Sequence, residues 1–288
     1  MERPYNPIKN MAIQRIQDAF QNTPIFIAGM VPGYPDFHTS FEAYKTLIDA
    51  GADMVEFSAS FSDPIADGPT LQKAHAEVIK AGLTQKQLLQ FYSRLREHNS
   101  RVPFFLIEYA NVIYQTGIET YYERIKKAGI DALMIPDLSI EDADNYISPA
   151  RENGIAQVFA IAPTTPNERI LKISKKASGF LYLVTITGIT GVRTNFEQES
   201  LDFITRVKQH TNLPCIAGFG ISKPEHAEVF TKAGSNGVVS CSQIVNIVTE
   251  QHNTMPTMQK FLKDYVVSMK KAVIKKSAQH SLQLPNLC

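Results

Sequence analysis

Short apolar runs alternate with longer segments of helical periodicity along almost the entire chain. Runs of about five apolar residues predict buried strands, because a strand covered on both faces shows no polar alternation. The expected strands are residues 24–29, 53–57, 103–108, 131–135, 156–162, 179–184, 214–218 and 236–240. Apolar residues at helical spacing predict the segments between them as helices, at about 40–50, 71–81, 84–99, 119–128, 141–153, 167–176, 199–210, 224–233 and from near 242.

These segments make eight strand–helix units, preceded by a short amphipathic helix at residues 9–21. Strands that alternate with helices indicate a parallel sheet with right-handed crossovers. Eight such units in a chain of this length fit a closed barrel better than two doubly wound domains. We therefore expect an α/β fold: a single (β/α)8 TIM barrel domain over residues 1–275 with an extra N-terminal helix, and a polar C-terminal tail at 276–288.

The composition narrows the class of protein. The 29 Lys and Arg residues nearly balance the 28 Asp and Glu residues, so a net charge of +1 gives no footprint for nucleic acid or an anionic membrane. No apolar run approaches the roughly 18 residues of a membrane span, and the polar N-terminus is unlike a secretory signal. Cys215, Cys241 and Cys288 are widely spaced, which fits a reducing compartment. We expect a soluble cytoplasmic protein without a metal site.

The stretch from Asp53 to Pro69 carries the first indication of chemistry. Glu56 lies near the end of an apolar strand, where an unpaired charge is costly, and Asp67 follows on a turn-rich loop. An acid on a rigid element with a second acid on a loop suits general acid–base catalysis. The alternative is a structural Glu56 paired with a basic residue, together with an Asp67 that only caps the next helix.

The other strand ends add polar residues to the same end of the expected barrel, where active sites of such barrels lie. Glu108 and Tyr109 end the third strand, Asp137 follows the fourth, and Tyr182 lies within the sixth. Glycines and hydroxyls at residues 187–191, 218–222 and 240–242 suit a phosphate held by backbone N–H groups and a helix start. Each signal also has an ordinary explanation as a tight turn, a helix cap or a core aromatic, so the indication of a phosphorylated small-molecule substrate comes from their convergence.

Several segments together resemble the tryptophan synthase alpha subunit family across nearly the full length. The residues that carry the resemblance are 55–56, 61–69 with Gln72, 109–111, 136–138, 162–165 with Glu168 and Arg169, 179–182, 188–191 and 218–222. The loop around Asp63 and Asp67 is highly specific to that family, whereas the glycine turns occur in many phosphate-binding barrels.

The resemblance implies a lyase of tryptophan biosynthesis that cleaves indole-3-glycerol phosphate to indole and glyceraldehyde 3-phosphate by a retro-aldol reaction. Glu56 matches the family's acid–base residue, Asp67 the acid that binds the indole N–H, and Tyr182 a supporting tyrosine. The implied substrate-binding residues are Tyr109, Asp137, Thr190, Gly191, Phe219, Gly220, Cys241 and Ser242. No cofactor is implied on this chain; pyridoxal phosphate belongs to the β subunit, the expected partner in an α2β2 complex.

The chain departs from the family pattern at several positions near the expected site. Ser58 and Cys241 replace glycines, Ser60 and Ser139 replace prolines on the side expected to meet the partner, and Gly29 stands where a larger residue is common. A Cβ at residue 241 would crowd the phosphate if that backbone requires a positive φ.

Three hypotheses follow from this pattern. The first is an ordinary alpha subunit. The second is a stand-alone indole-3-glycerol-phosphate lyase, or a paralogue that acts on a related phosphorylated substrate, which the lost prolines allow. The third is a non-catalytic subunit that activates a pyridoxal-phosphate partner, which the retention of Glu56, Asp67 and Tyr182 disfavours.

Overall fold

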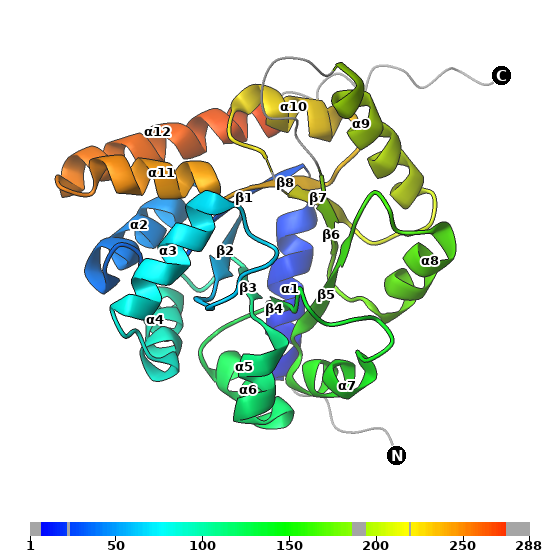
Figure 1. Cartoon of the computed structure of the whole chain (residues 1–288), viewed down its shortest axis with the longest axis horizontal. Coiled ribbons are helices and arrows are strands. Elements are labelled where there is room, and N and C mark those ends of the chain that lie inside the picture. The colour runs from blue at the N-terminus through cyan, green and yellow to red at the C-terminus, as the bar shows by residue number, and fades with distance from the viewer. Residues whose placement is uncertain (1–6, 22–23, 186–193, 219, 275–288) are drawn as a thin grey trace.

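Eight parallel strands close into a barrel in chain order, with β8 pairing back to β1 (Figure 1). The computed structural model describes residues 7–21, 24–185, 194–218 and 220–274. The strands are β1 Ile25–Met30, β2 Met54–Ser58, β3 Phe104–Ile107, β4 Ala132–Met134, β5 Ala156–Ile161, β6 Leu181–Val184, β7 Cys215–Gly218 and β8 Gly237–Ser240. The helices are α1 Pro7–Gln21, α2 Phe37–Asp49, α3 Pro69–Lys80, α4 Gln85–His98, α5 Ala110–Thr116, α6 Ile118–Lys127, α7 Asp144–Asn153, α8 Asn167–Lys176, α9 Thr194–Lys208, α10 Pro224–Lys232, α11 Ser242–Gln251 and α12 Met255–Ile274.

The predicted fold class is confirmed, and each predicted strand lies within two residues of an observed one. Two helices were missed. The seven-residue α5 directly follows a strand end, where a loop was expected, and α12 was not separated from the helix that begins near residue 242. Pro256 lies in the first turn of α12, where proline is tolerated, and marks the separate start. α12 packs against α2, α10 and α11 and so closes the helical ring between the last and first units.

The alternation of side chains along the strands decides which residues face the barrel interior. One buried cluster fills the interior and includes Ile25, Ile27, Met54, Phe105 and Tyr182. Successive residues of a strand point to opposite faces, so positions 29, 56 and 218 share the inward face of their strands, and residue 241, directly after β8, continues the alternation of that strand. The register pairs residue 29 with residue 56 across β1 and β2. The alternation of side chains along each strand therefore brings these residues together at the carboxyl end of the barrel.

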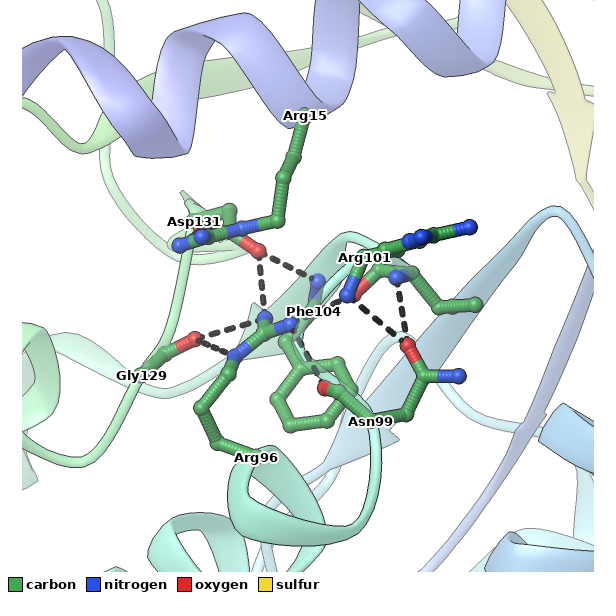
Figure 2. A network of polar contacts seen from close by, with 8 residues as sticks. Arg15, Arg96, Asn99, Arg101, Phe104, Gly129 and Asp131 are labelled. Atoms are coloured by element: carbon green, nitrogen blue, oxygen red, sulfur yellow. Dashed lines mark hydrogen bonds and ion pairs between the residues drawn. The ribbon is translucent and has the colours of Figure 1, made fainter.

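Helix α1 covers the opposite end of the barrel, where the strands begin. Its Ile16 belongs to the interior cluster, and its Arg15 donates to the buried carboxylate of Asp131 at 2.6 Å. Figure 2 shows Arg96 of α4 reaching the same carboxylate, with a contact of 2.6 Å between Nη2 and Oδ2. The backbone N–H of Phe104 also donates to Asp131, at 2.8 Å. One buried acid thus joins the leading helix, an outer helix and two strands.

None of the helices in the described part of the chain combines the length and the apolar character needed to cross a bilayer.

Candidate active site

Glu56 lies in β2 with its side chain inside the barrel mouth, only 2% exposed. Its Oε1 accepts a hydrogen bond from the Cys241 thiol at 3.0 Å, and its buried Oε2 has no hydrogen-bond partner in the described part of the chain. Burial raises the pKa of Glu56 to about 7, the thiol hydrogen bond opposes this rise, and the charge of Asp67 adds to it. The acid therefore populates both protonation states near neutral pH, which general acid–base catalysis requires.

Cys241 comes from the residue after β8, and its thiol fills space beside Gly29 of β1. A Cβ built on Gly29 would lie 2.7 Å from the Cys241 sulfur, so the glycine makes room for the thiol. Residue 241 has φ −123°, so its backbone does not require the positive φ under which a Cβ would have crowded the phosphate. The residues at positions 29 and 241 therefore depend on each other: the absence of a side chain at Gly29 leaves the space that the Cys241 thiol fills.

Asp67 lies on the loop before α3, where it contacts a buried histidine. Its Oδ2 is 3.0 Å from Nε2 of His75, and the Asp67 side chain is 13% exposed. Gly68 is the N-cap of α3 and makes no side-chain capping bond, so Asp67 does not have the capping role of the alternative reading. No ion pair joins Glu56 to a basic residue within the described ranges, which also removes the other half of that alternative.

Tyr182 of β6 lies across the barrel mouth over the backbone of β7. A Cβ built on Gly218 would lie 2.1 Å from the Tyr182 hydroxyl, so the glycine is required by the position of the ring. Burial raises the pKa of Tyr182 well above its ordinary value, and the charges of Glu56 and Asp67 add to this rise. The phenol is therefore neutral and can donate or accept a hydrogen bond.

Tyr109 and Asp137 support the loops around the mouth. The Tyr109 ring stacks on Phe61 with centroids 4.3 Å apart, and its hydroxyl accepts from the Ala66 N–H at 3.3 Å. Burial raises the pKa of Tyr109 to about 12. Asp137 Oδ1 accepts from the N–H of Ala110, the first residue of α5, at 2.9 Å. Tyr109 thus supports the loop that carries Asp67 through its contacts with Phe61 and Ala66. Asp137 accepts from the start of α5, a helix that the sequence analysis did not predict.

The expected phosphate site lies at the ends of β7 and β8, two paired neighbours. Gly220 has φ +72°, a conformation that favours glycine. Ser242 is the exposed first residue of α11, at the helix end where backbone N–H groups point outward. The predictions for Thr190, Gly191 and Phe219 lie outside the described residues.

His75 is the main site residue that sequence reasoning missed. It is fully buried on α3, on the same face as Leu71, Ala74 and Val78. A histidine on an otherwise apolar helical face, eight residues after a candidate acid, is the signal that could have identified it. Glu108 also proves to be buried with a pKa raised to about 7 by desolvation, but its carboxylate accepts from Tyr121 on the outer side of the barrel.

A buried acid of raised pKa and a loop-borne acid at the mouth of a TIM barrel are the arrangement expected of a barrel enzyme that works by acid–base catalysis. The family model described as tryptophan synthase alpha chain matches residues 16–274. The chain belongs to the tryptophan synthase alpha chain family, whose members are lyases that cleave indole-3-glycerol phosphate.

Relatives and solved structures agree with this assignment. The chain is 39% identical over 260 residues to the tryptophan synthase alpha chain of Methanoregula boonei, a match that covers 90% of this chain and 98% of the relative. It is 41% identical over 224 residues to that of Methanothermobacter thermautotrophicus, covering 78% and 83%. The tryptophan synthase alpha subunit of Pyrococcus furiosus superposes with a TM-score of 0.79 at 33% identity, covering 86% and 98%. A tryptophan synthase α2β2 complex from the same organism contains a chain that matches at 34% identity with a TM-score of 0.79.

Proposed function

We propose that Glu56 is the acid–base catalyst for retro-aldol cleavage of indole-3-glycerol phosphate. Glu56 begins protonated and gives its proton to the indole carbon that bears the glycerol chain. The resulting carboxylate takes the proton of the adjacent glycerol hydroxyl as the carbon–carbon bond breaks. The bonding electrons return to the ring, which leaves as indole, and the hydroxyl carbon becomes the aldehyde of glyceraldehyde 3-phosphate. Glu56 ends protonated, as it began.

Asp67 stabilises the charge that develops during this reaction. Protonation of the ring carbon places positive charge on the indole nitrogen, and a carboxylate that accepts the N–H stabilises that charge where it forms. The Oδ1 of Asp67 has no hydrogen-bond partner among the described residues and is available to the substrate. Tyr182 lines the same space as a neutral hydroxyl that supports Glu56.

The backbone of Gly220 and the start of α11 at Ser242 hold the phosphate. Cys241, between them and Glu56, contributes its backbone to the phosphate site and its thiol to the acid. This anchor places the glycerol carbons under Glu56, because the phosphate is at the far end of the substrate from the ring.

The chain works with a β subunit in an α2β2 complex, as the Pyrococcus furiosus relative does. Pyridoxal phosphate belongs to that partner, and the chemistry proposed for this chain uses only side chains and backbone. The family acts in tryptophan biosynthesis, and on that ground we propose the cytoplasm as the location.

The observation that carries this proposal is the buried carboxyl group of Glu56, which has a pKa of about 7 and one oxygen without a hydrogen-bond partner among the described residues. The test is indole release from indole-3-glycerol phosphate, with and without the β subunit. Cleavage that rises strongly with the β subunit, together with its loss in Glu56→Gln, is the expected result. Fast cleavage that is indifferent to the β subunit would indicate a stand-alone lyase. Unchanged turnover in Glu56→Gln would remove Glu56 from its role.

A further inference from the structure

His75 contacts three points of the segment that carries Asp67. Its Nδ1 lies 3.4 Å from the backbone nitrogen of Phe61, and its Nε2 lies 3.0 Å from Asp67 Oδ2 and 3.4 Å from Ser58 Oγ. Ser58 is the last residue of β2, and Phe61 and Asp67 lie on the loop that follows. One buried ring therefore connects the last residue of β2, the first part of the loop that follows and the acid near the end of that loop.

The hydrogen-bond pattern indicates which ring nitrogen carries the proton of the neutral ring. Phe61 offers an N–H to Nδ1, so this nitrogen must carry a lone pair. The proton of the neutral ring is then on Nε2, which donates to the Asp67 carboxylate. A doubly protonated ring would place two donors against each other at Phe61. Ser58 faces the same nitrogen as Asp67, so the three residues do not form a serine–histidine–aspartate relay, which needs the two partners on different ring nitrogens.

We propose that His75 is a positioning residue for Asp67: it holds Oδ2 and thereby directs Oδ1 toward the indole N–H of the substrate. This inference rests on the proposed function, because it assigns a partner to the acid that the mechanism uses. A neutral donor leaves the negative charge on Asp67, which is what stabilisation of a developing cation requires. The second contact, at Phe61, holds the loop in the conformation that brings the acid over the barrel mouth.

The competing explanation is a core histidine that only stabilises α3 against β2. Two substitutions separate the explanations, because each amide reproduces one ring nitrogen. His75→Gln places an amide near the Nε2 position and can still donate to Asp67. His75→Asn places its amide near the Nδ1 position, so it keeps a partner for Phe61 but cannot reach Asp67. A merely structural role predicts similar effects of both variants.

The experiment measures kcat and KM for indole release by the full chain with its β subunit, together with thermal unfolding of each variant. We expect His75→Asn to lower kcat/KM by about ten- to hundredfold, the loss typical of a misplaced reacting group. We expect His75→Gln to recover to within about threefold of the parent, because the donor to a charged acceptor is kept. His98→Gln is the matched control: His98 pairs with Asp49 at 2.8 Å in the outer helix layer and should leave turnover unchanged.

An Asp67→Ala background makes the test specific to the proposed pair. If His75 acts through Asp67, adding His75→Asn to Asp67→Ala causes no further loss. The same loss in both backgrounds, or equal losses in the Asn and Gln variants, would overturn the role of His75 and leave the proposed function standing. Full turnover by Asp67→Ala would instead overturn the role of Asp67 in the reaction, and the role of His75 with it.

Nitrogen NMR of the unmodified protein gives a readout that needs no variant. The proposed state has a protonated Nε2 and an unprotonated Nδ1 in His75. A proton on Nδ1 of the neutral ring would reverse the donor and acceptor roles and refute the proposal directly.

Discussion

Removal of the thiol beside Glu56 should change the pH dependence of the reaction in a predictable direction. In Cys241→Ala, Glu56 Oε1 loses the hydrogen bond that it accepts at 3.0 Å. That bond stabilises the ionised form of Glu56 and opposes the effect of burial on its pKa. The pKa of Glu56 should therefore rise above its present value of about 7. Cys241→Ser keeps a donor at the same position and serves as the control.

The size of the shift follows from the strength of one hydrogen bond. A hydrogen bond to a charged acceptor contributes about 1.5–3 kcal/mol, and a thiol is a weak donor, so the lower end applies. About 1.4 kcal/mol corresponds to one pKa unit, which places the pKa of Glu56 in the variant at about 8. The other ionisable groups whose charges act on Glu56 are Asp67, Tyr44 and Tyr182. The pKa values of both tyrosines are raised by burial, so they stay neutral over this range.

The assay is kcat/KM for indole release as a function of pH. Glu56 must begin protonated, so activity should fall as the pH rises through its pKa. We expect this alkaline limb near pH 7 in the parent and in Cys241→Ser, and about one unit higher in Cys241→Ala. An unchanged limb in Cys241→Ala, or a limb at lower pH, would show that the thiol does not stabilise the carboxylate. An activity that rises with pH through this range would refute the proposed order of proton transfers.

Three further predictions concern stability and packing. Burial raises the pKa of Glu108 to about 7, so the folded state holds a proton that the unfolded state releases, and stability falls as the pH rises from about 4.5 to 7. The free energy of unfolding of Glu108→Gln, measured with urea, should therefore rise by up to about 3 kcal/mol relative to that of the parent between pH 5 and 8. A difference between the two proteins that does not change with pH would contradict this. Asp131→Ala leaves two arginines without their buried partner and should cost about 3–5 kcal/mol, whereas a loss below about 1 kcal/mol would show that the network in Figure 2 is not important for stability. Gly218→Ala should displace Tyr182 and lower kcat by about a hundredfold, while Gly68→Ala, whose Cβ meets nothing within 4 Å, should not; equal activities would contradict the packing.

The sequence determined the fold class because the periodicity of apolar residues is a local property. Short apolar runs and helical spacing repeat eight times, and parallel strands joined by helices have few ways to close. The helix α5 was not predicted, because seven residues are too few to show helical periodicity. The helix α12 was not recognised as a separate helix, because no end was assigned to the helix before it. The sequence also identified Glu56 and Asp67 as candidate acids, because one lies near the end of an apolar strand and the other on a turn-rich loop that is highly specific to one family.

Only the tertiary structure decided what surrounds those acids. The thiol of Cys241 reaches Glu56 across 185 positions of sequence, and Gly29 of a third strand leaves the space for it. His75 faces Asp67 because α3 folds back over the loop that precedes it. The pKa of Glu56 depends on how completely the closed barrel excludes water from one carboxyl group. Local patterns determine which elements form, but desolvation and side-chain contacts across strands depend on three-dimensional closure, and these set the chemistry of the site.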